Sequence, residues 1–531
     1  MKKNITSIIF AILIVNFTFS QTRYLDEVFD AVDVTDTVKY ADNLSVILAS
    51  QGVPLVPTGA HPLCPDLVFD FFEPQGDTAM LRPLLIFLHT GTFAPIYLNN
   101  NPTGSRKDYA TTKMCTDFAK RGYAVANLEY RLGWNGGTGT LEENSLSLML
   151  AVYRAIQDTK AAVRYFYKDA KENGNTYKID TNRIAIVGQG SGGWVGLGYA
   201  AVKDTADLQL SKFLDADGNM LIQMDQIGDW DGYGGNPAIN VENNAGYSDD
   251  IKMVCSIGGG MGALDWLDAG DVPITAVHCH TDPVAIYTTG DVSVTTTAGL
   301  VDITTDISGS YDVIAKSNML GNNDVISGIS DAYTTAANSS SLGIVGALDM
   351  FGQTVGDPVE NLFPFNTGNP GESSPWDFWS DSVTLANAPL VGQDGQAILD
   401  NAALTNPDMS IMKSHAYIDS IMGFFCPRIV KALELEESTP TSINDLSASI
   451  IKIYPNPSNG NFNFSSSSIM NQIRIFDQFG KIVKVVSPNS HNYNLILDYL
   501  PKGFYYSEIK NEDDLFVEKM IIKWFYLFDL I

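Results

Sequence analysis

The chain has 531 residues and a net charge of −28, and a chain of this length predicts two or three domains. The excess of acidic residues excludes nucleic acid and anionic membrane surfaces as expected partners, because both require a basic binding face. Five cysteines in so long a chain do not form a disulfide framework, and their odd number leaves at least one thiol unpaired.

The N-terminal residues 1–20 have the pattern of a secretory signal peptide. Two lysines precede an apolar run over residues 5–19, and small residues stand before an expected cut near Gln21. A membrane anchor is the weaker interpretation, because the run is short and Asn16 interrupts it. No later segment is apolar and long enough to span a bilayer, so we expect a mature protein without a membrane span.

From residue 21 to 435, strand-like and helix-like patterns alternate. Such alternation predicts an α/β domain with a mostly parallel sheet and helices on both faces. The expected strands are 67–74, 83–89, 123–130 and 183–188, and the expected helices are 113–122, 148–170 and 416–435. Residues from about 287 to 400 are rich in Ser, Thr, Gly, Asn and Asp without a clear period, and we interpret them as an insertion over the sheet.

The pattern changes beyond residue 435. Residues 436–448 have the composition of a linker. Residues 449–523 contain short strand-like runs about ten residues apart with turn residues between them, which predicts a small C-terminal β-sandwich. The apolar stretch WFYLFDLI forms a tail, 524–531.

The C-terminal module resembles a known family. Its runs IYPNPSNGNF, IRIFDQFGKIV, LPKGFYYSEI and EKMIIK are similar to the sorting domain of cargo for the Bacteroidetes type IX secretion system. The resemblance implies that residues 449–523 bind the type IX secretion machinery. It also implies a protein exported through the periplasm and then secreted or attached to the cell surface. The tail after Lys523 departs from the family pattern, and a carbohydrate-binding β-module is the alternative.

The runs LRPLLIFLHTGTF, FAKRGYAVANLEYRLGW and VPITAVHCHTDPVAIY follow in this order along residues 65 to 290. In that order they resemble carboxylesterase-like α/β-hydrolases. The resemblance implies the α/β-hydrolase fold and cleavage of an extracellular ester, small or polymeric, with no cofactor and no metal.

The stretch IAIVGQGSGG, residues 184–193, is a strand followed by a glycine-rich turn. It matches both the nucleophile elbow G-x-S-x-G and, through Gly188, Gly190 and Gly193, the dinucleotide loop G-x-G-x-x-G. A dinucleotide loop normally opens its domain and precedes an acidic residue some 20 positions on. Here the glycines come late in the chain and a polar segment follows, so the elbow is the favoured interpretation.

Two registers of the elbow remain open. The positions two before and two after the apex must be small, because the turn presses against neighbouring backbone. An apex at Ser191 puts Gln189 at one of them, whereas an apex at Gly190 puts Gly188 and Gly192 there. The spacing favours Gly190, which leaves no nucleophile at the apex.

The resemblance implies a set of site residues in the chain order of the fold. The candidate catalytic residues are Ser191, Asp282 and His415, although His415 falls in the expected first turn of the last helix. The loop His89, Gly91, Thr92 and Phe93 would supply the oxyanion hole, and the elbow glycines are Gly188, Gly190, Gly192 and Gly193.

Two metal patterns are incomplete. His278, His280 and Asp282 form H-x-H-x-D, but Pro283 stands where the zinc pattern needs a further histidine. DADGN at 215–219 resembles a calcium loop, but Met220 occupies the glycine position, and a hairpin turn is the favoured interpretation.

The sequence therefore predicts a secreted carboxylic-ester hydrolase. A catalytically silent binding protein with the same fold is the alternative, and a zinc hydrolase is a minor one.

Overall fold

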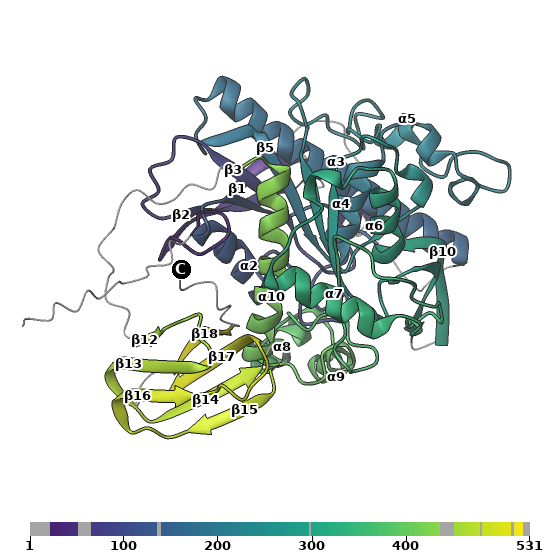
Figure 1. Ribbon diagram of the computed structural model, residues 1–531. Coiled ribbons are helices and arrows are strands. Elements are labelled where there is room, and N and C mark those ends of the chain that lie inside the picture. The colour runs from purple at the N-terminus through teal and green to yellow at the C-terminus, as the bar shows by residue number, and fades with distance from the viewer. Residues whose placement is uncertain are drawn as a thin grey trace, which may run out of the picture.

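The computed structural model describes residues 22–50, 65–134, 140–296, 299–435, 451–477, 480–510 and 515–523. The predicted signal peptide (1–20), linker (436–448) and tail (524–531) lie outside these residues, as does Cys64. The described chain forms a large α/β domain and, at its C-terminal end, a smaller domain of strands (Figure 1).

An eight-stranded sheet forms the centre of the large domain, in the order β1-β2-β4-β3-β5-β6-β8-β11. The first two strands are antiparallel to their neighbours, and the six from β4 to β11 run parallel. The strands are β1 Val32–Asp42, β2 Asp66–Pro74, β3 Arg82–Leu88, β4 Ala124–Leu128, β5 Ile179–Gln189, β6 Met253–Ile257, β8 Ile274–Cys279 and β11 Leu362–Phe365. The predicted α/β class with a mostly parallel sheet is confirmed.

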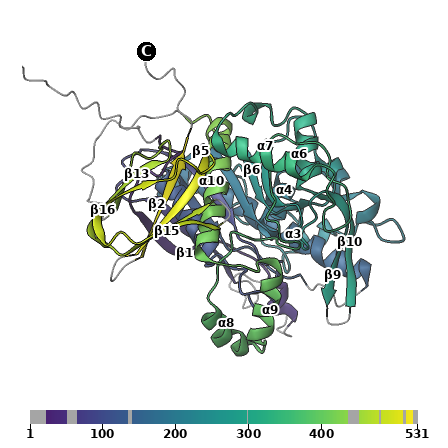
Figure 2. The same ribbon diagram turned by 60° about the horizontal axis from the view of Figure 1, so that its bottom comes forward.

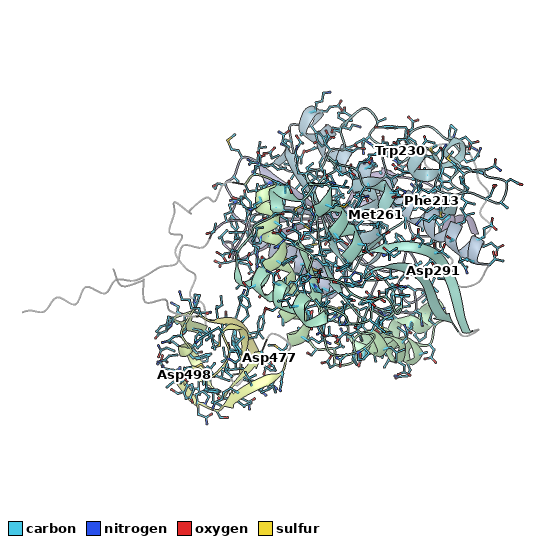
Figure 3. The ribbon with its side chains drawn as sticks, turned by 45° about the vertical axis from the view of Figure 1, so that its right-hand side comes forward. Phe213, Trp230, Met261, Asp291, Asp477 and Asp498 are labelled. Atoms are coloured by element: carbon cyan, nitrogen blue, oxygen red, sulfur yellow. The ribbon has the colours of Figure 1, made fainter. Side chains whose placement is uncertain are left out.

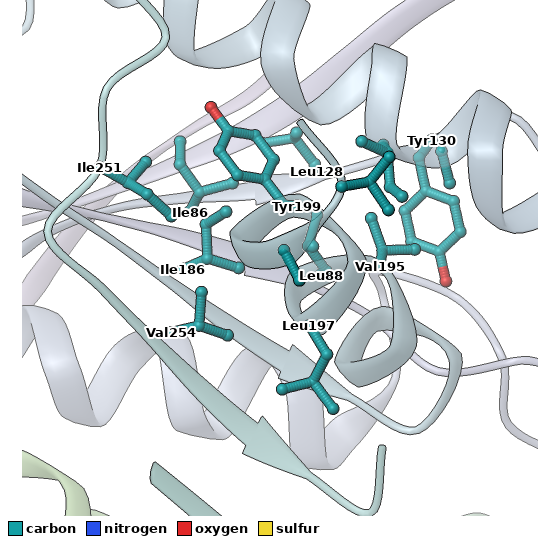
Figure 4. Packing of buried hydrophobic residues seen from close by; sticks show 14 of the residues in the cluster. Ile86, Leu88, Leu128, Tyr130, Ile186, Val195, Leu197, Tyr199, Ile251 and Val254 are labelled. Carbon is teal, nitrogen blue, oxygen red and sulfur yellow. The ribbon is translucent and has the colours of Figure 1, made fainter. Parts of the chain in front are cut away.

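Helices cover both faces of the sheet and bury a separate core on each. On β3, Leu84, Ile86 and Leu88 face one core while Leu85 and Phe87 face the other, because side chains alternate along a strand. Figure 4 shows the first core, where α4 packs on the sheet. The helices are α1 Val46–Ser50, α2 Tyr109–Lys120, α3 Leu141–Glu172, α4 Ser191–Ala201, α5 Met224–Ile227, α6 Ser310–Met319, α7 Ala332–Ile344, α8 Asp381–Asn387, α9 Gly395–Thr405 and α10 Ile411–Ala432, with 3₁₀ turns η1 Ala206–Leu208, η2 Ser211–Phe213, η3 Leu264–Trp266, η4 Asp324–Ile326 and η5 Ala388–Val391.

The region 287–400 is more than an insertion. It begins with a hairpin of β9 Thr289–Thr296 and β10 Gly299–Gly309, which pairs with β7 Gly260–Met261 outside the main sheet. It also contains β11, which pairs in parallel with β8 as an edge strand of the main sheet. The four residues LFPF are too few to show a strand period in the sequence. After β11, the chain forms the lobe of α8 and α9 (Figure 2).

The smaller domain is a β-sandwich, as predicted. One sheet has the order β12-β13-β16 and the other β15-β14-β17-β18, and the two enclose one core. The strands are β12 Ile451–Tyr454, β13 Asn461–Met470, β14 Gln472–Asp477, β15 Ile482–Val486, β16 Ser490–Ile496, β17 Gly503–Lys510 and β18 Leu515–Ile522.

The sandwich packs against α7 and α10 of the large domain (Figure 1). The ring of Phe504 stacks on Tyr333 with centroids 4.4 Å apart. Lys519 forms an ion pair of 3.1 Å with Asp419. The interface therefore combines a stacked ring pair with a pair of opposite charges.

Four cysteines are described, and none of them forms a disulfide. All four are buried in the core between the sheet and helices α2 and α10: Cys115, Cys255, Cys279 and Cys426. No helix among the described residues is both long and apolar enough to cross a bilayer.

Candidate active site

The turn between β5 and α4 has Gly190 at its apex. This residue has φ 54° and ψ −117°, and α4 begins at the next residue, Ser191. Its N–H donates to the carbonyl of Ile257 at 2.7 Å, which ties the apex to β6. The backbone of Gly190 lies in a region that glycine adopts at little cost.

The glycines on either side of the apex allow a close approach of backbone. A Cβ at Gly188 would lie 2.1 Å from the carbonyl oxygen of Gly192, and a Cβ at Gly192 would lie 2.2 Å from that of Leu88. Neighbouring backbone therefore packs directly against Gly188 and Gly192, the positions two before and two after Gly190.

Thr90 fills the space in front of the apex. A Cβ at Gly190 would lie 2.2 Å from the Thr90 hydroxyl oxygen and 3.0 Å from its Cβ. A side chain at the apex and the present side chain of Thr90 therefore exclude one another. The sequence signal for this contact is the threonine of HTGTF, directly after the histidine, and sequence reasoning missed it.

Ser191 lies in the first turn of α4 and is 7% exposed. Its hydroxyl lies 3.1 Å from that of Tyr130, which in turn donates to the carbonyl of His89 at 2.7 Å. Because the Tyr130 proton is committed to His89, the serine hydroxyl donates to the phenol oxygen. Figure 4 shows Tyr130 beside Val195 of α4.

The predicted oxyanion loop follows β3 directly. Three consecutive residues have positive φ: Gly91 at 131°, Thr92 at 52° and Phe93 at 54°. The ring of His89 is buried and stacks on Tyr130 with centroids 4.6 Å apart. Left-handed backbone at two non-glycine residues in succession is uncommon, and it gives this loop a fixed, strained shape.

Asp282 lies just after β8, in a turn that its own carboxylate holds. One oxygen accepts from the N–H groups of Val284 at 2.7 Å and Ala285 at 2.9 Å. The other lies 3.5 Å from Nε2 of His278, whose Nδ1 lies 2.9 Å from the hydroxyl of Ser310. The imidazole beside this carboxylate is therefore His278. The spacing of four residues across a strand end is the signal that could have indicated it.

His415 is the fifth residue of α10, one turn after the start of the helix, whereas the sequence predicted it in the first turn. Its Nε2 is 2.5 Å from the hydroxyl of Tyr109, and the two rings are stacked at 8°. Burial, with a smaller contribution from Lys113, lowers the pKa of His415 to about 4. The three candidate catalytic residues are all described, and no hydrogen bond joins any two of them; each has a different partner.

A buried carboxyl that sequence reasoning missed lies next to the elbow. Asp377, on the loop after β11, accepts from Nε2 of Gln189 at 2.9 Å. Burial raises the pKa of Asp377 to about 6. Burial, with a smaller contribution from the nearby Asp377, also raises the pKa of Asp108, before α2, to about 7. The large residue at position 189 was a signal of this contact, whereas no sequence pattern marked Asp377.

The zinc alternative depends on His278, His280 and Asp282. Both ring nitrogens of His278 already have partners, Ser310 on one side and the carbonyl of Ala285 on the other, at 3.1 Å. Across the residues that the structure covers, no cluster of three or more His, Cys, Asp or Glu side chains is arranged to hold a metal ion. At DADGN, the Asp215 carboxylate accepts from the N–H groups of Asp217 and Asn219 within its own turn.

Two family models match the chain. Residues 69–291 match the BD-FAE model, an α/β-hydrolase-type esterase domain, and residues 452–523 match the secretion system C-terminal sorting domain. The chain has the α/β-hydrolase fold and a type IX sorting domain. The sorting domain indicates export, with the protein secreted or held at the cell surface.

Solved structures similar to this α/β-hydrolase include esterase 2 of Thermogutta terrifontis. Its apo form is 15% identical, over 48% of this chain and 74% of that chain, with a TM-score of 0.29. The same esterase phosphorylated by paraoxon is 16% identical, over 48% and 73%, with a TM-score of 0.29. No curated protein matches the chain.

Proposed function

We propose that this exported α/β-hydrolase is a binding protein that does not turn over esters through a serine. The observation that carries the proposal is the apex of the elbow, where Gly190 stands and Thr90 fills the space in front of it. A serine hydrolase needs its hydroxyl at this apex, on the strained turn, where it faces the oxyanion loop.

The surroundings of Ser191 support the proposal. A serine becomes a nucleophile when an adjacent base takes its proton. The partner of Ser191 is the phenol of Tyr130, and burial raises the pKa of that phenol well above its usual range. A phenol that holds its proton at neutral pH is no general base, so Ser191 lacks activation.

The other two candidate residues, Asp282 and His415, also make contacts that stabilise the fold. Asp282 holds its own turn and lies beside His278. Nε2 of His415 is hydrogen-bonded to the hydroxyl of Tyr109, and a pKa near 4 makes His415 a poor base at neutral pH.

The second candidate function is a carboxylic-ester hydrolase, in which Ser191 attacks, His415 is the base and Asp282 orients it. The match of residues 69–291 to an esterase-type model favours it. This function requires a rearrangement that brings these three side chains together. Its substrate would be an extracellular ester, small or polymeric.

Hydrolysis of short-chain nitrophenyl esters separates the two functions, because such esters demand little of a pocket. We expect the purified full chain and Ser191→Ala to hydrolyse them at the same background rate, and a fluorophosphonate probe to leave Ser191 unlabelled. The matched control is Ser317→Ala, which removes another buried hydroxyl on a helix, one that donates a hydrogen bond to Asn323. Turnover that is lost on Ser191→Ala alone would reject the binding protein and establish the esterase, since loss of the nucleophile removes most of a triad's rate.

A further inference from the structure

An apolar cavity lies between α3 and α4, and none of the candidate catalytic residues lines it. The segment of η1 and η2 covers it, and β7 and β10 close its side. Figure 3 labels Phe213 of η2 and Met261 of β7 on this side of the α/β domain. Its lining is Leu148, Met149, Val152, Tyr153, Ile156, Trp194, Val202, Leu208, Phe213, Ile222, Gly260, Gly262, Trp266, Thr304 and Ile307.

The lining carries no charged side chain, and the polar side-chain atoms of Tyr153, Trp266 and Thr304 have partners in the protein. The hydroxyl of Tyr153 donates to the carbonyl of Gly228 at 3.2 Å, and Nε1 of Trp266 donates to that of Asp207 at 2.7 Å. The hydroxyl of Thr304 accepts from Ser145 at 3.0 Å. A charged or strongly polar ligand would lose its hydration here without compensation.

Two indole rings shape the cavity, and glycines make room for both. A Cβ at Gly262 would lie 2.2 Å from the ring of Trp266, and a Cβ at Gly260 would lie 3.0 Å from the ring of Trp194. Phe213 stacks on Trp266 with centroids 5.3 Å apart. The walls are therefore flat aromatic faces held by packing.

The cavity is small and has an apolar entrance. Its volume is about 50 Å³, which is room for a few heavy atoms. Leu148, Met149 and Val152 on α3 are only partly buried at its edge, as is Trp194. A small apolar group can therefore enter beside α3 without crossing a polar surface.

We propose that this cavity binds the short alkyl end of a small uncharged molecule. None of the candidate catalytic residues lines it, so the inference goes beyond the proposed function and does not depend on Ser191. Burial of apolar surface drives binding, and the cavity volume limits the bound group to a few heavy atoms.

The probes are 1-butanol as an uncharged alkyl chain and butyrate as a charged chain of the same length. Each is titrated into the full chain, with binding followed by tryptophan fluorescence and by the shift of the thermal midpoint. We expect saturable binding of 1-butanol, and affinity for butyrate lower by about tenfold or more.

Val152→Phe places a larger side chain at the entrance and should weaken binding by about tenfold or more. Val383→Phe, on the exposed face of α8, is the matched control and should bind as the native chain does. Met149→Trp is a second filling variant in case Val152→Phe does not fold. The proposal is wrong if 1-butanol does not saturate, if butyrate binds equally well, or if folded filling variants bind as the native chain does.

Discussion

Thr90 and Gly190 are in contact at the tip of the elbow, so a change of side-chain size at either residue alters the packing at the other. A serine at the apex must adopt positive φ, and its Cβ must displace the Thr90 hydroxyl, 2.2 Å away. The present pair avoids both costs.

Gly190→Ser should therefore lower the free energy of unfolding by about 2–4 kcal/mol, from backbone strain plus overpacking. Adding Thr90→Gly should recover about 1 kcal/mol or more of that loss, because the two sites share one contact. Chemical denaturation of the two single variants and the double variant measures the coupling.

Gly76→Ser is the control for strain alone. Gly76 has φ 75°, and an added Cβ would meet nothing within 4 Å, so this variant should lose only about 1 kcal/mol. Equal losses at positions 76 and 190, with no coupling to Thr90, would refute the clash.

At the scale of elements, the sequence predicted most of the α/β domain because its helices and strands are long and periodic. The predicted helix 148–170 lies within α3, and the strand 183–188 lies within β5. Strand β11 was not predicted, because it is only four residues long. Asp377 follows it on an irregular loop, and only three-dimensional contact with Gln189 reveals its place at the site.

Helix α10 was predicted, but the chemical environment near its N-terminal end was not. His415 packs there against the ring of Tyr109. The pairing joins residues 306 positions apart, and spacing within one helix carries no information about it. Burial lowers the pKa of His415 to about 4, with a smaller effect from Lys113.

The lowered pKa makes stability depend on pH. Between pH 6.5 and about 4, the unfolded chain protonates His415 while the folded chain does not, so stability falls as the pH falls. His415→Gln should remove this part of the loss, which is at most about 3 kcal/mol and smaller to the extent that solvent reaches the ring.

Urea unfolding at a series of pH values measures the effect, with His491→Gln in the sandwich as the control. We plot the free energy of unfolding of each chain against pH. We expect the difference between the His415→Gln and native curves to be smaller at low pH than at pH 7.5. Parallel curves throughout would mean that His415 does not titrate as described.

At the scale of the whole molecule, the sorting domain has its own core and rests on α7 and α10 through a limited interface. The α/β domain has cores that contain no residue of the sandwich. The two domains therefore need not fold together.

A chain that ends at residue 435 should fold and keep a thermal midpoint within a few degrees of the full chain. In the native host it should not reach the cell surface or the medium, because it lacks the sorting domain. Fractionation and immunoblotting measure its location.

The matched control is Phe504→Ala with Lys519→Ala, which keeps the sorting domain and loosens its contact with Tyr333 and Asp419. We expect this variant to be exported. Export of the truncated chain would show that sorting information lies elsewhere.

Export exposes the four described thiols to an oxidising environment. Disulfides form in oxidising compartments outside the cytosol, and thiolate is the species that attacks. Burial raises the pKa of Cys115, Cys255, Cys279 and Cys426, the last to about 12. Once the core has folded, these thiols are shielded from disulfide exchange. Whether they oxidise therefore depends on how fast the core folds. Cross-linking competes with folding only during the interval in which the chain has left the reducing cytosol and its core is still open.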